Sequence, residues 1–171
     1  MRLAYVCTDP GIPVFGTKGA SIHVQEMLRA FLGLGAEVTL VSPRIDGERP
    51  AGLAGLRLRP LTPVPGGDPE SRARAALALN AEVGALLSEG APFDLVYERH
   101  ALYAHAAMET ARLLGRPGIL EVNAPLIAEQ ARHRTLARAA DAEPTSAPAA
   151  ARRGLVYANA QPLHNAEKLT G

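Results

Sequence analysis

A strand, a glycine-rich loop, a helix and a second strand follow one another within the first 42 residues, and this order restricts the fold more than any other feature. The first strand is the short apolar run Leu3–Cys7, which ends before the turn-forming residues Asp9–Gly11. Apolar residues then recur at helical spacing over Ile22–Leu34, with Ser21 as the expected N-cap, and Glu37–Ser42 has the pattern of a second strand. The sequence therefore predicts a βαβ unit with a right-handed crossover.

The rest of the chain repeats this alternation of strands and helices. Further strands are expected over Leu56–Leu61, Asp94–Tyr97, Gly118–Val122 and Gly154–Ala158, and further helices over Pro69–Ser88, Ala101–Leu114, Asn123 to beyond Leu136, and Pro162–Leu169. Leucine alternates with arginine or proline in the third strand, which predicts an edge strand with one buried face. We therefore predict an α/β fold: a Rossmann-like, doubly wound parallel sheet of about six strands in the order 3-2-1-4-5-6, with helices on both faces.

Length and composition are those of a single domain spanning residues 1–171. The chain is 47% hydrophobic, enough for one core, and the proline-containing stretch 139–153 is expected to be a flexible loop. A net charge of +1 and few aromatic residues (three Phe, four Tyr, no Trp) disfavour nucleic-acid binding, and no apolar run is long enough to predict a membrane span. The single cysteine and the lack of a signal sequence favour a cytoplasmic protein, and peripheral contact with the inner membrane surface stays open.

The loop after the first strand is the first candidate site. In an open parallel sheet with this strand order, ligands bind beyond the carboxyl ends of the strands, where the loop 8–20 and the segment 98–100 meet. The loop holds Gly16, Lys18 and Gly19 and leads into a helix N-terminus, whose unpaired N–H groups attract an anion. It matches neither the P-loop nor the dinucleotide fingerprint, although Arg44 after the second strand keeps NADP as an alternative ligand.

A second group of polar residues follows the fourth strand. Arg99 has the geometry to bind a phosphate or a carboxylate, but it could equally neutralise Glu98 or Glu121 in an internal ion pair. His100 can donate to a sugar hydroxyl or exchange a proton near neutral pH. Glu121 lies in an apolar strand and needs a partner, and Asn123, at the same end of the sheet, either binds a ligand or stabilises the local turn.

Four stretches in this order resemble the N-terminal, acceptor-binding half of a family-4 glycosyltransferase with the GT-B fold. They are Gly16–Val24, Gly35–Val41, Asp94–His100 and Leu120–Leu126, the last followed by Glu129. The resemblance implies a retaining transferase that moves a sugar from a nucleotide sugar to an acceptor, whose identity it does not indicate. It implies no bound metal and no cofactor, and it places the reaction in a cleft between two Rossmann-like domains.

The resemblance also implies roles for individual residues. The loop Gly16–Ser21 would approach the donor diphosphate, and His100 is the catalytic candidate. The substrate-binding candidates are Gly16, Lys18, Gly19, Ser21, His23, Glu98, Arg99, Glu121, Asn123 and Glu129. The donor-binding domain of resembling proteins is absent after Gly171, so we expect the isolated chain to turn over little substrate without that domain in cis or in trans. The rival interpretations are an NADP-binding reductase domain and a binding module without catalysis.

Overall fold

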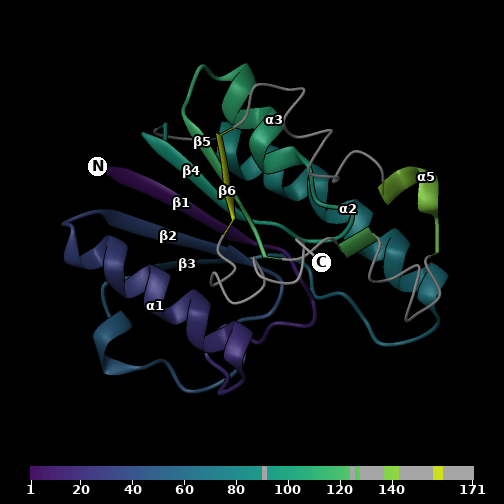
Figure 1. The fold of residues 1–171 in the computed structure, drawn as a ribbon, viewed down its shortest axis with the longest axis horizontal. Helices are drawn as coiled ribbons and strands as arrows, with labels where there is room; N and C mark the ends of the chain where they lie inside the picture. The colour runs from purple at the N-terminus through teal and green to yellow at the C-terminus, as the bar shows by residue number, and fades with distance from the viewer. Residues whose placement is uncertain (90–91, 124–125, 128–136, 143–155, 160–171) are drawn as a thin grey trace, which may run out of the picture.

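A single parallel sheet organises the computed structural model, which describes residues 1–89, 92–123, 126–127, 137–142 and 156–159. The strands are β1 (Arg2–Cys7), β2 (Glu37–Ser42), β3 (Arg57–Pro60), β4 (Leu95–Arg99), β5 (Gly118–Val122) and β6 (Val156–Asn159). Their order is β3-β2-β1-β4-β5-β6 (Figure 1), and every neighbouring pair is parallel. Strands β1 to β5 confirm the predicted order and fold class, and β6 extends the sheet beside β5.

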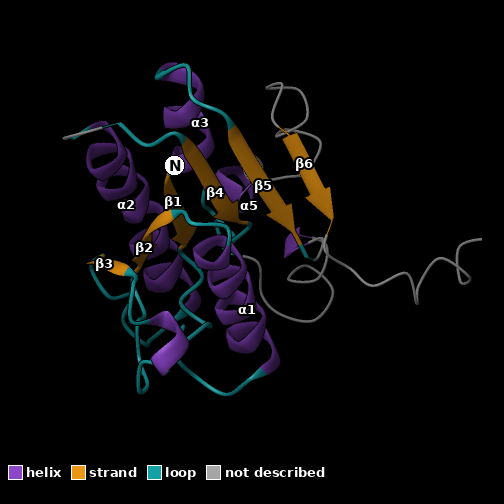
Figure 2. Cartoon of the chain, turned by 90° about the vertical axis from the view of Figure 1, so that its left-hand side faces the viewer, coloured by secondary structure: helices purple, strands orange, loops and turns teal. Residues whose placement is uncertain are grey.

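Helices cover both faces of the sheet, as the sequence predicts. Helix α1 (Gly19–Gly33) packs on one face, and α2 (Pro69–Ser88) and α3 (Ala106–Leu113) pack on the other (Figures 1 and 2). Alternate residues of β1 point to opposite faces of the sheet. Leu3 and Tyr5 belong to the hydrophobic cluster under α1, whereas Ala4 and Val6 belong to the cluster under α2 and α3. The strands are therefore buried on both sides, which explains their nearly continuous apolar sequence.

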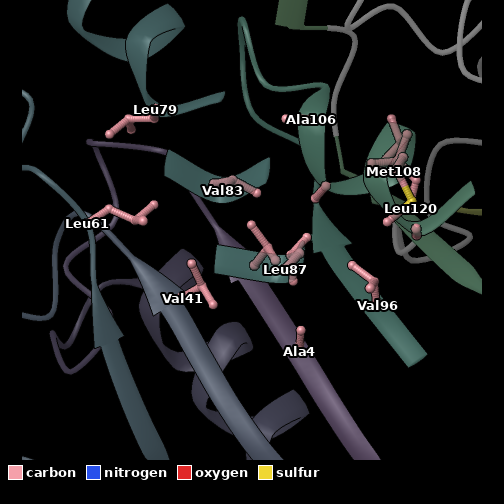
Figure 3. Close-up of a cluster of buried hydrophobic side chains, with 14 residues drawn as sticks. Ala4, Val41, Leu61, Leu79, Val83, Leu87, Val96, Ala106, Met108 and Leu120 are labelled. Atoms are coloured by element: carbon pink, nitrogen blue, oxygen red, sulfur yellow. The ribbon is translucent and has the colours of Figure 1, made fainter. Parts of the chain in front are cut away.

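An apolar stripe on α2 forms much of the core on its face of the sheet. Leu79, Val83 and Leu87 recur every four residues, so they share one side of the helix. Figure 3 shows them above the strand residues Val41 and Val96, and all five side chains are almost completely buried. This packing fixes α2 against the sheet and leaves its other side to solvent.

Two helix starts and the burial of one strand differ from the sequence prediction. Helix α1 begins at Gly19, so Lys18 is its N-cap and Ser21 lies inside the helix rather than capping it. Helix α3 begins at Ala106 instead of residue 101, because Tyr103 has a left-handed backbone (φ 70°) that a helix cannot contain. The predicted buried face of the third strand is only partly present: Leu56 and Leu61 on either side of β3 are buried, whereas all four residues of β3, including Leu58, are exposed.

Several predicted segments fall outside the described residues. These are the last helix over Pro162–Leu169 and, apart from a few residues, the helix expected from Asn123 to beyond Leu136. The loop predicted over 139–153 is wrong at its start, because Ala139–Ala142 form the short helix α5. Residues 143–153 also lie outside the described part.

Gly47 determines how closely the segment after β2 approaches the loop after β1. Its φ is +104°, and a Cβ placed there would lie 2.2 Å from the carbonyl oxygen of Phe15. Both conditions exclude a side chain. Nearby, the Phe15 N–H donates to the Asp46 carbonyl (3.1 Å).

We therefore expect Gly47→Ala to lower the free energy of unfolding by about 3 kcal/mol, through backbone strain and the clash with Phe15. The matched control is Gly35→Ala, whose φ is also positive (+76°) but whose Cβ would meet nothing within 4 Å. That control should cost about 1 kcal/mol. Urea unfolding measures both, and equal losses would contradict the close approach at Gly47.

Candidate functional site

The carboxyl ends of β1, β4 and β5 meet the N-terminus of α1. Cys7 at the end of β1 pairs with Arg99 at the end of β4, so the loop after β1 starts beside the polar residues that follow β4. On α1, His23 Nε2 lies 2.7 Å from Glu121 Oε1 at the end of β5. The structure thus brings together the two segments that the sequence analysis expected at one crevice.

Gln25 holds the loop after β1 from the side of α1. Its side chain is buried, and its amide Nε2 donates to the carbonyl oxygens of Val14 and Gly16, both at 2.8 Å. From the opposite side, the Val14 N–H donates to the Arg44 carbonyl at 3.0 Å. The loop is therefore ordered by hydrogen bonds within the protein before any ligand binds.

Gly16 and Gly19 differ in the space available for a side chain. A Cβ at Gly16 would lie 2.9 Å from Pro13 Cγ and 3.1 Å from Ser21 Oγ, so packing requires glycine there. A Cβ at Gly19 would meet nothing within 4 Å, so packing does not require glycine at this position.

The N-terminus of α1 is open in a way that those of α2 and α3 are not. No side chain caps α1, its first turn holds no acidic residue, and its N-cap is the exposed Lys18. Helix α2 is capped by Asp68, which accepts from the Ser71 N–H at 3.0 Å. Asn80 closes α3 by accepting from the N–H groups at its start. Of these three helices, α1 alone has N–H groups at its start that no side chain caps, at the positive end of its dipole.

Two buried hydroxyl groups near this end of α1 have no hydrogen-bond partner among the described residues. They belong to Ser21, in the first turn of α1, and to Thr8, which follows β1. Ser21 Oγ also borders the space beside Gly16. Both hydroxyl groups can therefore still form a hydrogen bond near the start of the helix.

Glu121 is the centre of the cluster at the ends of β4 and β5. Its residue is fully buried, and its Oε1 accepts from Arg99 Nη1 (2.8 Å) and Asn123 Nδ2 (2.6 Å) as well as lying beside His23. Its Oε2 accepts from the hydroxyl of Tyr97 at 2.8 Å. The expectation that Glu121 needs a partner is met. Because its oxygens are enclosed by these donors, direct contact with substrate is not supported by the geometry.

The alternatives for Arg99 and Asn123 can now be compared with their contacts. Arg99 pairs with Glu121 and not with Glu98, and its side chain is 11% exposed. Its Nε and Nη2 make no hydrogen bond to the described residues, so they remain as donors. The amide of Asn123 donates to the side chain of Glu121 two residues away, a contact that tests neither of the two roles expected for Asn123.

Glu98 is turned away from this cluster, contrary to its expected place in the crevice. Since β4 continues to Arg99, strand alternation sends Arg99 and Glu98 to opposite faces of the sheet. The Glu98 side chain is buried beside α3 and accepts from the backbone N–H of Met108. Burial raises its pKa from 4.5 to about 8.

The remaining candidates are placed as follows. His100 is buried after β4, and its backbone N–H donates to the Glu121 carbonyl at 2.8 Å. Glu129 lies outside the described residues. Arg44, on which the NADP alternative rests, uses its guanidinium to bind Asp46 (2.8 Å) and the Pro10 carbonyl (3.0 Å).

Sequence reasoning missed two side chains that position the site, Gln25 and Asn80. Asn80 donates to the Tyr103 carbonyl at 2.8 Å and accepts from His105 and Ala106, so it holds the loop between β4 and α3. The available signal was an amide on the apolar side of each predicted helix, next to Val24 in one case and Leu79 in the other. A buried amide at such a position needs tertiary partners.

A groove of about 500 Å³ lies at the opposite, amino-terminal end of the sheet. Arg2, Glu37, Arg57, Arg59, Leu86 and Phe93 are among its lining residues. Arg57 is paired with Glu37 (3.1 Å), and Arg2 with Asp94 (3.9 Å), so its charges are largely balanced. No helix N-terminus is among the lining residues, and we place the candidate site at the carboxyl ends instead.

Two classes of feature are absent from the described part of the chain. No three His, Cys, Asp or Glu side chains are gathered there as metal ligands. None of the helices there combines the length and the apolar character needed to cross a lipid bilayer.

We expect Gln25→Met to loosen the loop, because methionine fills similar space but donates no hydrogen bond to Val14 or Gly16. Amide hydrogen exchange at Val14 and Phe15 should become at least tenfold faster, and stability should fall by about 1–3 kcal/mol. Glu26→Met, at the exposed neighbouring position, is the control and should leave exchange unchanged. Unchanged exchange in Gln25→Met would exclude its role in ordering the loop.

The raised pKa of Glu98 predicts a pH-dependent stability. The folded state keeps the Glu98 proton up to about pH 8, whereas the unfolded chain releases it near 4.5, so the stability of the wild type should fall as the pH rises between these values. Glu98→Gln removes this dependence. Relative to the wild type it should gain roughly 2–4 kcal/mol on going from pH 5 to pH 8 in urea unfolding. The exposed Glu89→Gln is the control, and parallel pH profiles for the wild type and Glu98→Gln would refute the prediction.

Comparison with known proteins gives matches only among solved structures. No family model matches the sequence, and no curated protein sequence matches it significantly. A sucrose-phosphate synthase from Thermosynechococcus elongatus is 14% identical with a TM-score of 0.51, over 78% of this chain and 37% of that one. UGT73P12 from Glycyrrhiza uralensis, complexed with glycyrrhetinic acid 3-O-monoglucuronide, is 16% identical with a TM-score of 0.49, over 76% and 29%. The chain thus spans about a third of the length of these proteins, and it shares the fold of part of the synthase.

Proposed function

We propose that this chain is one substrate-binding domain of a glycosyltransferase of the GT-B type. In this proposal the loop after β1 and the N-terminus of α1 bind the diphosphate of a nucleotide sugar, and the acceptor lies against the ends of β4 and β5. A second domain, in cis or in trans, grips the nucleotide. Transfer is retaining, with His100 beside the reacting groups.

The observation that carries the proposal is the uncapped N-terminus of α1 at the crevice. A diphosphate needs several N–H donors and a positive field, and α1 supplies both at Gly19–Ser21, with the Lys18 ammonium beside them. The loop is already ordered by Gln25, so binding an anion requires little further ordering. The fold shared with part of a sucrose-phosphate synthase and the resemblance to family-4 glycosyltransferases support the same assignment.

The geometry does not favour the NADP alternative. Arg44, its expected contact with a 2′-phosphate, is committed to Asp46 and Pro10 in the described structure. The binding module without catalysis shares the same anion site, and the two are separated by adding the donor-binding domain. Sugar transfer that appears only when both domains are present supports the transferase.

Gly19 offers a direct test of the diphosphate site. Proline suits the first position of a helix, Lys18 already has the extended backbone that precedes proline (φ −78°, ψ 157°), and a Cβ at Gly19 would meet nothing within 4 Å. Gly19→Pro should therefore keep the fold and remove one N–H donor. Its affinity for UDP and for inorganic pyrophosphate, measured by calorimetry, should fall about tenfold or more.

The matched control is Gly19→Ala, which keeps the N–H group and should bind like the wild type. Amide resonances of residues 18–21 should move on titration of the wild type with UDP. Binding of both anions with equal affinity by Gly19→Pro and Gly19→Ala, or no shift at these amides, would contradict the proposed site.

A further inference from the structure

We propose that Glu121 is a positioning residue, whose buried carboxylate fixes the Arg99 guanidinium as a preformed donor at the candidate site and holds the His23 ring beside it. This inference rests on the proposed function, because the guanidinium would face the diphosphate bound at the N-terminus of α1. Glu121 itself does not contact the ligand.

The contacts of Glu121, which lies in β5, join this strand to two other elements. Arg99 and Tyr97 come from β4, and His23 comes from the first turns of α1. His23 is the donor to Oε1, since the same oxygen already accepts from Arg99 and a carboxylate cannot donate. One group thus sets the relative position of a helix and two strands.

Tyr97 fixes the position of the Glu121 carboxylate. Its ring is stacked on Tyr5 (centroids 5.1 Å apart) and meets the edge of Phe31 at 5.2 Å. These contacts fix the tyrosine ring, and its hydroxyl holds Glu121 Oε2. The orientation of the carboxylate is therefore decided by the packing between the sheet and α1.

The two side chains that Glu121 holds are partly exposed. The side chain of Glu121 is 1% exposed, that of Arg99 is 11% exposed and that of His23 is 36% exposed. The carboxylate of the cluster is therefore enclosed, whereas the Arg99 and His23 side chains are accessible. Arg99 also retains donors that no described residue uses.

Stability alone is a poor explanation for this cluster. Replacing a buried ion pair by apolar side chains is often neutral or stabilising, because removing charges from water is costly. A fully enclosed carboxylate with several donors does, however, lock its partners into one geometry. Such a lock is useful where a donor such as the Arg99 guanidinium must meet a ligand without reorganising.

Glu121→Gln tests the inference, because the amide retains the shape and removes the charge. Simple charge counting predicts tighter anion binding after a negative charge is removed next to Arg99. Positioning predicts the opposite: the dissociation constant for inorganic pyrophosphate, measured by calorimetry on the whole chain, should rise about tenfold as Arg99 and His23 lose their charged acceptor. Glu37→Gln, which breaks an exposed ion pair with Arg57 far from the crevice, is the control and should bind like the wild type.

Nitrogen NMR of the His23 ring gives a second readout that a general loss of stability would not move. In the wild type, Nε2 should carry the proton and show one fixed state, and in Glu121→Gln this state should be lost while the amide spectrum of β1 and β2 stays unchanged. Equal or tighter pyrophosphate binding by a folded Glu121→Gln overturns the inference and leaves the proposed function intact.

If the wild type binds no pyrophosphate, the proposed function fails, and the His23 signal alone decides: an unchanged ring state in Glu121→Gln overturns the positioning role. If Glu121→Gln does not fold, Tyr97→Phe replaces it, since it removes one anchor of the carboxylate and keeps the ring packing. Its dissociation constant should rise two- to threefold, and a value equal to that of the wild type overturns the inference.

Discussion

The chain leaves two neighbouring strands, β1 and β4, toward opposite faces of the sheet, and the candidate site depends on this arrangement. The strands pair in parallel as far as Cys7 and Arg99, after which α1 packs on one face of the sheet and α3 on the other. Open parallel sheets bind ligands at strand ends between two such helices. Here the first turns of α1 meet the end of β5 directly, through the contact between His23 and Glu121.

Hydrophobic periodicity was sufficient to predict the strands, the helices and burial of the sheet on both faces, because such burial leaves nearly continuous apolar strands. The sheet order followed from the doubly wound pattern of the βαβ units. Periodicity was insufficient for the polar residues at the end of β4. Glu98 and Arg99 are adjacent in sequence, but β4 continues through both, so alternation separates them onto opposite faces. Whether a polar residue belongs to the strand or to the loop depends on pairing with β1 and β5, which sequence spacing does not contain.

Helices α1, α2 and α3 differ in how their N-termini are capped. This difference explains why one of these N-termini is suited to an anion. Asp68 closes α2 from within its own sequence, so this cap could be predicted. Asn80 and Glu98 close α3 from other elements, through contacts that exist only in the folded chain. The expected cap of α1, Ser21, lies inside the helix instead, and the helix start is left to Lys18 and solvent. The uncapped N-terminus of α1 is therefore a property of the folded chain that its own sequence does not reveal.

Two side chains of helix α1 connect the end of β5 with the loop after β1. Successive helical residues are about 100° apart, so His23 and Gln25, two positions apart, point in nearly opposite directions. One reaches Glu121 at the end of β5, and the other reaches the carbonyls of Val14 and Gly16 in the loop. A rotation of α1 that improved one set of contacts would break the other. The first turns of the helix are thus held in a single position by folding itself, and the conformational entropy of ordering them is lost before any ligand arrives.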